Sequence, residues 1–354
     1  MLEHYEIEHG LEAVSKLIKQ LEAEIIKIEA KAAVAVTENP NAYAQITNDA
    51  RSEIYAVTEQ YRKKIDKATI KTVTALAETD LSAQMALYQQ AFEKGVLRAA
   101  PLVGESIQAA ITSEVARNMA FMKETLDRVE QYAGRNIANI VQNSAYNLFN
   151  GETVEKVVKA AAIDIRDKGL QITLPSGRNV NDIEAYMRRH VVSSVAANSM
   201  AMQGDLADTL DIDPSKKWYE TSSHIGPRPE HEVWQGRIFK SWDEFVATTG
   251  YGTVTGIGGV NCRHTWYVFI QGVSTQRFFP ISKEENDARY KAQQQQRYYE
   301  RMVRQWKTQL NVNEAMGLDT ATEKAKVSQY QAALREWTKQ NDLTRQYARE
   351  QVAK

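Results

Sequence analysis

The side chains best suited to metal binding or catalysis are concentrated between residues 223 and 264. This stretch contains three of the six histidines, His224, His231 and His264, and the only cysteine, Cys262. Cys262 and His264 are two positions apart, so their side chains point to the same face of an extended strand. The sequence on both sides is rich in Ala, Glu, Gln and Lys, which favour helices. We therefore expect any specific chemistry to lie in this segment.

One cysteine and three histidines form a ligand set of the kind that binds Zn²⁺ in a tetrahedral arrangement. Pro227 and Pro229 exclude a regular helix between His224 and His231, but a rigid turn there still allows both imidazoles to point inward. The spacing matches that of no standard zinc finger. In the alternative interpretation, the prolines fix a turn, the histidines donate to backbone carbonyls and Cys262 is a small buried core residue. Zn²⁺ is the one cofactor that the sequence suggests.

Enzymatic use of the same segment is a further hypothesis. In one version, Cys262 is a nucleophile and His224 or His231 is its base. Arg228 or Arg263 would then stabilise an oxyanion. In another version, two histidines, an asparagine and a metal ion hydrolyse a phosphodiester. The chain contains no His-Glu-x-x-His or Gly-x-Ser-x-Gly motif, and the glycine-rich run 256–259 lacks the Gly-Lys-Ser/Thr ending of a phosphate-binding loop. We therefore expect no enzyme and no small-molecule substrate.

Composition narrows the class of protein. The chain has 354 residues, 43% of them hydrophobic and 25% charged, which is typical of a folded protein with one or two domains. A net charge of −1 argues against a protein that coats nucleic acid, because such a protein needs a basic surface. The single cysteine excludes an internal disulfide framework and fits a reducing compartment. The N-terminus has no signal sequence, and the apolar stretches are too short to cross a bilayer, so we expect a soluble protein made in a cytoplasm.

The N-terminal sequence predicts a long helix with an apolar seam. Apolar residues alternate at spacings of three and four, as in a coiled coil; they are Leu11, Val14, Ile18, Leu21, Ile25 and Ile28, extended by Ala32 and Ala35. Pro40 ends this helix. An antiparallel helical hairpin within the chain is favoured over a seam to another subunit, because three heptads are few for an autonomous coiled coil.

The rest of the chain gives a mainly α fold with a small α+β module. Helices are expected from Ile54 to Phe92 and from Glu105 to Phe149, a small hairpin over 169–180, and a helix capped by Asn181-Asp182. Strands are expected at 217–220 and 266–270, and two helices after residue 282, separated at Gly317. The expected regions are a helical N-terminal part over 1–165, an α+β module with the hairpin and the Gly/His/Cys-rich core over 166–280, and a helical tail over 281–354.

Several unusual motifs occur in the same order as in a known family. They are Ser223-His224 through Arg228-Pro229 to His231, then Trp234-Gln235-Gly236, Gly250-Tyr251-Gly252 and Asn261-Cys262-Arg263-His264. This series resembles the signature of the tailed-phage minor capsid protein 2 family, which is related to the Mu-type head-morphogenesis proteins. The resemblance covers about residues 170–310. The N-terminal helices are similar to that family in character alone.

The resemblance implies a structural protein of the virion. Members are low-copy head proteins at the portal vertex inside the capsid, where they assist capsid assembly and DNA packaging or delivery. The implied partners are the portal protein and, as further candidates, the major capsid protein, the scaffolding protein and packaged DNA, with no membrane. The protein would be made in the cytoplasm of the bacterial host and end inside the phage head. The competing hypothesis is a metal-dependent hydrolase or nuclease carried in the head.

The same resemblance assigns the central residues a structural role. His224, His231, Cys262 and His264 would hold the loops of the module together, with or without a metal ion. The other residues of the motif are Arg228, Pro229, Trp234, Gln235, Gly236, Gly252, Asn261 and Arg263.

Overall fold

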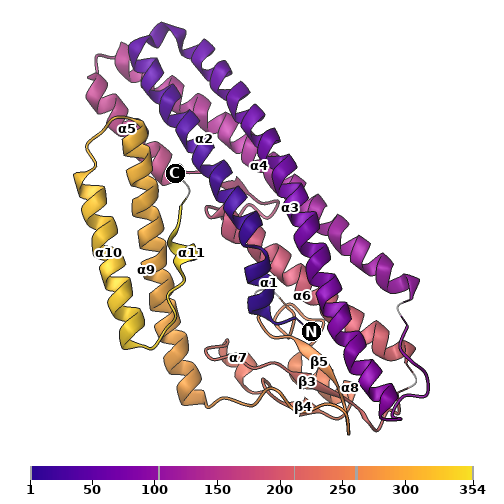
Figure 1. Cartoon of the computed structure of the whole chain (residues 1–354). Coiled ribbons are helices and arrows are strands. Elements are labelled where there is room, and N and C mark those ends of the chain that lie inside the picture. Colours follow the sequence, from indigo (N-terminus) through magenta and orange to yellow (C-terminus); the bar gives the residue numbers. More distant parts are fainter. Residues whose placement is uncertain (1, 103, 211, 260–261, 353–354) are drawn as a thin grey trace. The chain divides into compact units, whose positions relative to one another are not determined.

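Helices make up most of the chain. A computed structural model describes residues 2–102, 104–210, 212–259 and 262–352 (Figure 1). The helices are α1 (His4–Gly10), α2 (Glu12–Glu38), the short 3₁₀ helix η1 (Pro40–Ala42), α3 (Tyr43–Glu93), α4 (Glu105–Phe149), α5 (Val154–Lys168), α6 (Ile183–Thr209), α7 (Pro229–Glu232), α8 (Trp242–Thr249), α9 (Lys283–Ala315), α10 (Ala321–Gln340) and α11 (Tyr347–Glu350). The strands are β1 (Ile172–Thr173), β2 (Asn179–Val180), β3 (Lys217–Thr221), β4 (Ile238–Phe239) and β5 (Trp266–Ile270). The expected fold class, mainly α with a small α+β module, is confirmed.

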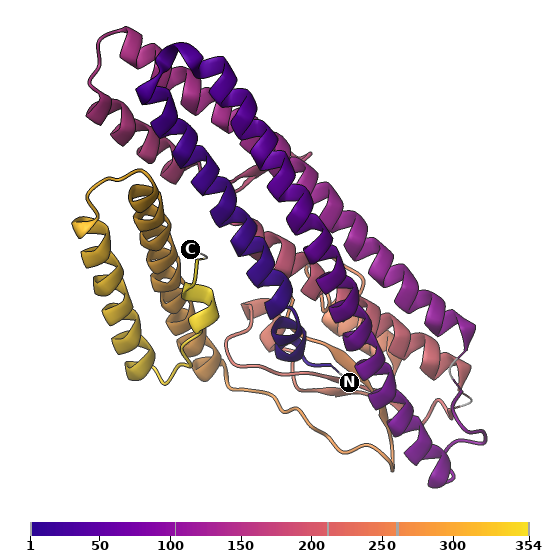
Figure 2. The same ribbon diagram turned by 45° about the horizontal axis from the view of Figure 1, so that its top comes forward.

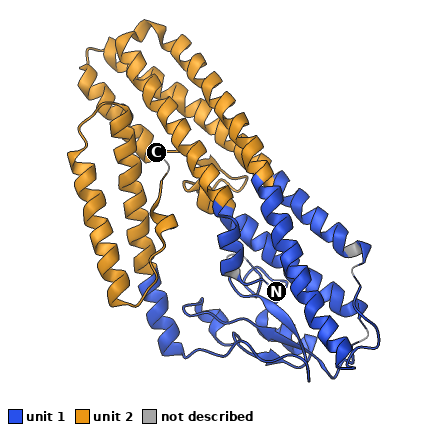
Figure 3. Cartoon of the chain, in the orientation of Figure 1, with its two compact units in different colours: residues 1–12, 68–120, 188–293 blue, residues 13–67, 121–187, 294–354 orange. Residues whose placement is uncertain are grey.

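The chain divides into two compact units, each assembled from three stretches (Figure 3). Unit 1 contains Met1–Glu12, Ala68–Ala120 and Arg188–Gln293, and unit 2 contains Ala13–Lys67, Phe121–Met187 and Gln294–Lys354. The helices α2, α3, α4, α6 and α9 contribute residues to both units, α2 with Glu12 alone in unit 1. The three consecutive regions expected from the sequence, 1–165, 166–280 and 281–354, stay a prediction about separately folding domains.

In unit 2, the apolar seam of α2 is buried within the chain. Val14, Ile18, Leu21, Ile25 and Ile28 are all buried, because α2 turns through η1 into α3 and the two helices lie side by side (Figures 1 and 2). This arrangement confirms the predicted internal hairpin. Pro40 opens η1, and at the start of a helix its missing N–H costs no helical hydrogen bond.

The α2–α3 hairpin packs against further helices of unit 2. The buried carboxyl group of Glu29 on α2 accepts a hydrogen bond from Asn136 on α4 at 2.9 Å. Arg62 on α3 forms an ion pair with Asp127 on α4 at 2.8 Å. A separate apolar cluster joins α2, α4, α5 and α9 around Ile165, which is fully buried. These contacts bury the amphipathic faces that the sequence pattern predicts.

Three predicted local features of unit 2 are also confirmed: a hairpin, a helix cap and a break between two helices. The strands β1 and β2 pair antiparallel through Ile172 and Val180, as expected for the hairpin over 169–180. Asp182 then caps α6 by accepting a hydrogen bond from the N–H of Ala185 at 3.0 Å. Gly317 has φ 69° after α9, and α9 and α10 lie side by side (Figure 2).

In unit 1, a three-stranded antiparallel sheet carries the α+β module. Its strand order is β4-β3-β5, and β3 pairs with β5 from Lys217–Ile270 to Thr221–Trp266. Helix α8 packs its buried Phe245 against Tyr219, Phe239 and Trp266, with ring centroids 5.6–5.7 Å apart. The predicted strands at 217–220 and 266–270 are confirmed. The strand β4 and the helices α7 and α8 were not expected from the sequence.

Within the described part of the chain, no helix has both the length and the apolar content needed to span a bilayer.

Candidate functional site

The pairing of β3 with β5 brings the two halves of the His/Cys segment together. Past the end of the ladder, the N–H of Ser222 donates to the carbonyl of Thr265 at 2.8 Å, and the N–H of Thr265 donates to Oγ of Ser222 at 2.9 Å. The residues that follow β3 therefore lie beside those that precede β5. His224 is on the first of these stretches, and Cys262 and His264 are on the second.

Helix α7 directs the side chain of His231 toward Cys262 and His264. Pro229 occupies its first position, where the fixed φ of proline favours a helix start. The N–H of His231 donates to the carbonyl of Arg228 at 2.9 Å, and the N–H of Gln235 donates to the carbonyl of His231 at 3.2 Å. The sequence interpretation excluded a regular helix between His224 and His231. Pro229 instead starts one short helical turn, and the residues before it are not helical.

Three of the four predicted ligands form one compact group. The Nδ1 atoms of His231 and His264 are 3.4 Å apart. The Sγ of Cys262 lies 3.8 Å from Nδ1 of His231 and 3.7 Å from Nδ1 of His264. All three side chains are buried, with exposed fractions of 2% for each histidine and 6% for the cysteine. The structure therefore brings three of the four predicted residues together, and their binding of a metal ion stays a prediction.

His224 is not a member of this group. Among the residues that the structure describes, the group whose ligand atoms all lie within 4.8 Å of one another consists of His231, Cys262 and His264. The ring of His224 stacks on the ring of His264, with centroids 4.2 Å apart and planes inclined at 25°. Trp234 packs against His231 and His264, with centroids 4.7 Å from each ring.

Two oxygen atoms hold the outer nitrogens of the clustered histidines. The Nε2 of His231 lies 2.8 Å from the backbone carbonyl of Thr255. The Nε2 of His264 lies 3.1 Å from Oε1 of Gln235, which also accepts the backbone N–H of His224 at 3.1 Å. Gln235 is fully buried. Sequence reasoning placed Gln235 in the motif but missed this role, and it missed Thr255 altogether.

The surroundings disfavour the charged forms of His231 and Cys262. Burial lowers the pKa of His231, although its hydrogen bond to the Thr255 carbonyl acts in the opposite direction. Burial also raises the pKa of the Cys262 thiol. A cysteine with a raised pKa holds little thiolate at neutral pH, so Cys262 is a poor nucleophile in this environment.

The other motif residues build the loops around the group. Arg228 precedes α7 and lies 4.0 Å from the carboxylate of Glu230. Gly236 has φ 68°, and a Cβ there would lie 2.2 Å from the carbonyl carbon of Phe279. Gly252 has φ 86° in an exposed turn, and a Cβ there would meet none of the described residues within 4 Å. Arg263 is half-buried, Pro229 is exposed, and Asn261 lies outside the described residues.

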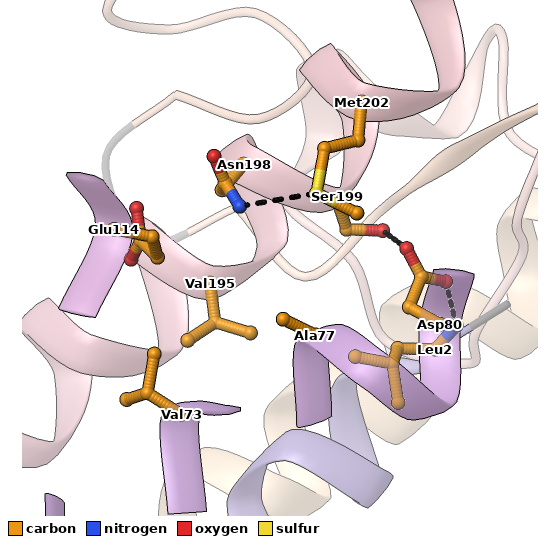
Figure 4. A pocket seen from close by; sticks show the side chains of 9 residues that line it. All are labelled: Leu2, Val73, Ala77, Asp80, Glu114, Val195, Asn198, Ser199 and Met202. Carbon is orange, nitrogen blue, oxygen red and sulfur yellow. Dashed lines mark hydrogen bonds between the residues drawn. The ribbon is translucent and has the colours of Figure 1, made fainter. Parts of the chain in front are cut away.

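A second group of polar side chains lines a small cavity in unit 1 (Figure 4). The buried carboxylate of Asp80 accepts hydrogen bonds from the N–H of Leu2 at 2.9 Å and from the hydroxyl of Ser199 at 2.6 Å. Glu114 also lines this cavity, whose volume is about 10 Å³. Such a space has room for about one water molecule and not for a substrate.

Comparison with known proteins supports the resemblance noted in the sequence. The family model described as phage minor capsid protein 2 matches residues 2–339. A structural protein of Lactococcus phage LL-H is 30% identical over 242 residues, which cover 62% of this chain and 63% of that protein. A structural protein of Lactococcus phage mv4 is 39% identical over 107 residues, which cover 29% of this chain and 87% of that protein. No solved structure matches this chain.

The chain thus spans 63% of the length of the LL-H protein, and the family model covers nearly all of the chain. The motifs around the buried His/Cys group lie within the matched range. This protein therefore belongs to the phage minor capsid protein 2 family and is a structural component of the virion.

Proposed function

We propose that this minor capsid protein acts at the portal vertex, inside the phage head. There it assists capsid assembly and DNA packaging or delivery by binding the portal protein. The major capsid and scaffolding proteins are further candidate partners. The net charge of −1 makes packaged DNA a secondary partner at most.

The observation that carries this proposal is the burial of the reactive side chains. Cys262, His231 and His264 are at most 6% exposed, and the ring of Trp234 packs against both histidines. An enzyme needs its nucleophile or metal ligands at a cleft that a substrate can enter. Here the same side chains fasten loops, and the long helices supply the surface for other proteins. We therefore propose that the protein acts by binding and not by catalysis.

Co-purification with the portal protein tests the partner. The full chain is co-expressed with a tagged portal protein of the same phage and, separately, with a tagged major capsid protein. We expect the chain to elute with the portal protein through affinity purification and gel filtration. A portal protein from an unrelated phage serves as the control. Elution with the major capsid protein alone, or with neither protein, contradicts the proposed location.

Protease protection tests the position within the virion. Trypsin is added to intact virions and to virions whose heads have been opened, and the chain is followed with an antibody. We expect trypsin to digest the chain only in the virions whose heads have been opened. Digestion of the chain in intact virions, under conditions that leave the DNA protected, contradicts a position inside the head.

One observation favours a second function, a metal-dependent hydrolase or nuclease. Among the described residues the group supplies three ligand atoms, two from histidines and one from a cysteine, and three protein ligands are the number found in catalytic zinc sites. Cys262→Ala and His231→Ala separate the two functions. In a binding protein both variants lower the melting temperature, whereas in an enzyme they leave the fold intact and abolish cleavage of DNA in the presence of Zn²⁺ or Mg²⁺.

A further inference from the structure

We propose that Nδ1 of His231, Nδ1 of His264 and Sγ of Cys262 bind one Zn²⁺ ion, and that His224 packs against this site without binding the ion. This metal would be structural, because it would join the chain after β3 to the chain before β5. The proposal rests on the geometry of the group and on its hydrogen bonds, and it is independent of the proposed function.

The distances within the group fit a tetrahedral zinc ion. Zn–N and Zn–S bonds of about 2.05 and 2.3 Å separate two nitrogens by about 3.4 Å, and a nitrogen from a sulfur by about 3.6 Å. The corresponding distances here are 3.4 Å between the nitrogens, and 3.7 and 3.8 Å from the nitrogens to the sulfur. One ion therefore reaches all three atoms with little rearrangement of the side chains.

The hydrogen bond of His231 fixes the position of its proton. The backbone carbonyl of Thr255 can only accept, so Nε2 of His231, 2.8 Å away, carries the proton and donates it. In a neutral imidazole the other nitrogen then carries a lone pair. The Nδ1 of His231 is therefore an acceptor that faces Cys262 and His264.

The same reasoning applies to His264 through Gln235. The backbone N–H of His224 is a donor, and it lies 3.1 Å from Gln235, so the amide oxygen must face it. That oxygen also faces Nε2 of His264 at 3.1 Å, and this nitrogen must therefore be the donor. The Nδ1 of His264 then carries a lone pair as well. Hydrogen bonds from the outer nitrogen to a carbonyl or an amide are what orients metal-binding histidines.

With these assignments, the lone pair on Nδ1 of His231 and the lone pair on Nδ1 of His264 face each other in a buried site. They lie 3.4 Å apart, and the single proton of the Cys262 thiol can be shared with only one of them at a time. Holding two acceptors against each other away from water is costly. A cation between the three atoms removes this conflict, and the backbone N–H of His264, 3.4 Å from Sγ, would then stabilise the thiolate.

The donor set and the burial identify the ion and its role. Two imidazoles and one thiolate suit Zn²⁺ better than Mg²⁺ or Ca²⁺, which prefer oxygen ligands. The stacked ring of His224 is outside the group of three. Among the described residues, three side chains thus supply ligands to the proposed ion. Because the three side chains are at most 6% exposed, the site suits a structural ion and not one that meets a substrate.

Metal analysis of the full chain is the first test. The protein is expressed with Zn²⁺ in the medium, purified without chelators and analysed by mass spectrometry of its elements. We expect one zinc per chain. Titration with Co²⁺ should then give a thiolate-to-cobalt charge-transfer absorption and the visible bands of tetrahedral Co²⁺. Because Cys262 is the only cysteine, such an absorption identifies it as a ligand.

Single substitutions test each residue against matched controls. Cys262→Ser should remove the charge-transfer absorption, and His231→Ala and His264→Ala should each weaken Zn²⁺ binding at least a hundredfold. His224→Ala should keep one zinc per chain, as should His9→Ala at an exposed position. If the ligand variants do not fold, the Co²⁺ spectrum of the natural sequence decides the matter. The proposal is overturned if that sequence binds neither ion, if Cys262→Ser keeps its zinc unchanged, or if His224→Ala loses it.

Discussion

The side-chain amide oxygen of Gln235 lies 3.1 Å from Nε2 of His264, and it also accepts the backbone N–H of His224. One buried oxygen thus orients the imidazole of a proposed metal ligand and fixes the loop that follows β3. Gln235 is a positioning residue, because it acts on the group through His264. Loss of such an outer hydrogen bond typically weakens metal binding tenfold to a hundredfold.

We therefore predict that Gln235→Met weakens the binding of Zn²⁺ about tenfold to a hundredfold. Gln235→Glu should restore most of the affinity, because its carboxylate can accept both hydrogen bonds. The affinity is measured by competition with a chromophoric chelator. Gln203→Met is the matched control, since Gln203 is equally buried in unit 1 but donates to the carbonyl of Trp266. Equal weakening by both methionine variants would contradict the role of Gln235.

Two motif glycines should differ in their tolerance of a side chain. Gly236→Ala should destabilise the protein by roughly 3 kcal/mol or more, because a positive φ is added to a clash with the backbone of Phe279. Gly252→Ala should cost about 1–2 kcal/mol, since it has the positive φ alone. Urea unfolding of the two variants gives these values. Equal costs would show that the approach of Phe279 does not constrain Gly236.

Much of the fold could be predicted, because a long helix repeats the same spacing of apolar residues over many turns. The seam of α2 follows from apolar spacing, and the end of α4 follows from Gly151. The strand Trp266–Ile270 follows from its run of aromatic and β-branched residues. The strand β4 has two residues, too few to show a period. The helix α8 had a signal that was missed. Ser241 caps this helix by accepting the N–H of Glu244 at 3.2 Å, and a serine followed three residues later by a glutamate is a sequence signature of a helix start.

Part of the candidate site could also be predicted from the spacing of residues in the sequence. The two-residue spacing of Cys262 and His264 places both on one face, and the structure sets their ligand atoms 3.7 Å apart. The carbonyl of Thr255 could not be identified, because every residue has a carbonyl and only the folded chain selects one. The exclusion of His224 likewise depends on how its ring stacks on His264.

Asp80 should be a strong stabilising residue of unit 1. Its buried carboxylate accepts from Leu2, from Ser199 and from the amide of Gln84 at 2.6 Å. Asp80→Ala leaves these donors without their acceptor, and we predict a loss of about 3 kcal/mol in the free energy of unfolding. Asp205→Ala on α6, at an exposed position, should change it by less than about 0.5 kcal/mol. Similar small effects for both variants would contradict the importance of these hydrogen bonds.

The buried carboxyl of Glu29 should make stability depend on pH. Burial raises its pKa to about 8, and the hydrogen bond from Asn136 offsets only part of this increase. Between the ordinary pKa of 4.5 and about 8, the folded state therefore holds a proton that the unfolded state has lost. Its contribution to stability is complete below pH 4.5 and falls as the pH rises, by at most about 1.4 kcal/mol per pH unit, until the folded protein also loses the proton.

We predict that Glu29→Gln removes this dependence, because the amide keeps the oxygen that faces Asn136 and carries no charge at any pH. The free energy of unfolding of the variant minus that of the natural sequence should increase between pH 5 and pH 8 and then level off. Urea unfolding at each pH measures the difference, from which the contributions of all other groups cancel. Glu24→Gln, on the same helix at a partly exposed position beside Lys27, should give a much flatter difference. If the two differences run parallel across this range, Glu29 is ionised in the folded protein and its burial is compensated in another way.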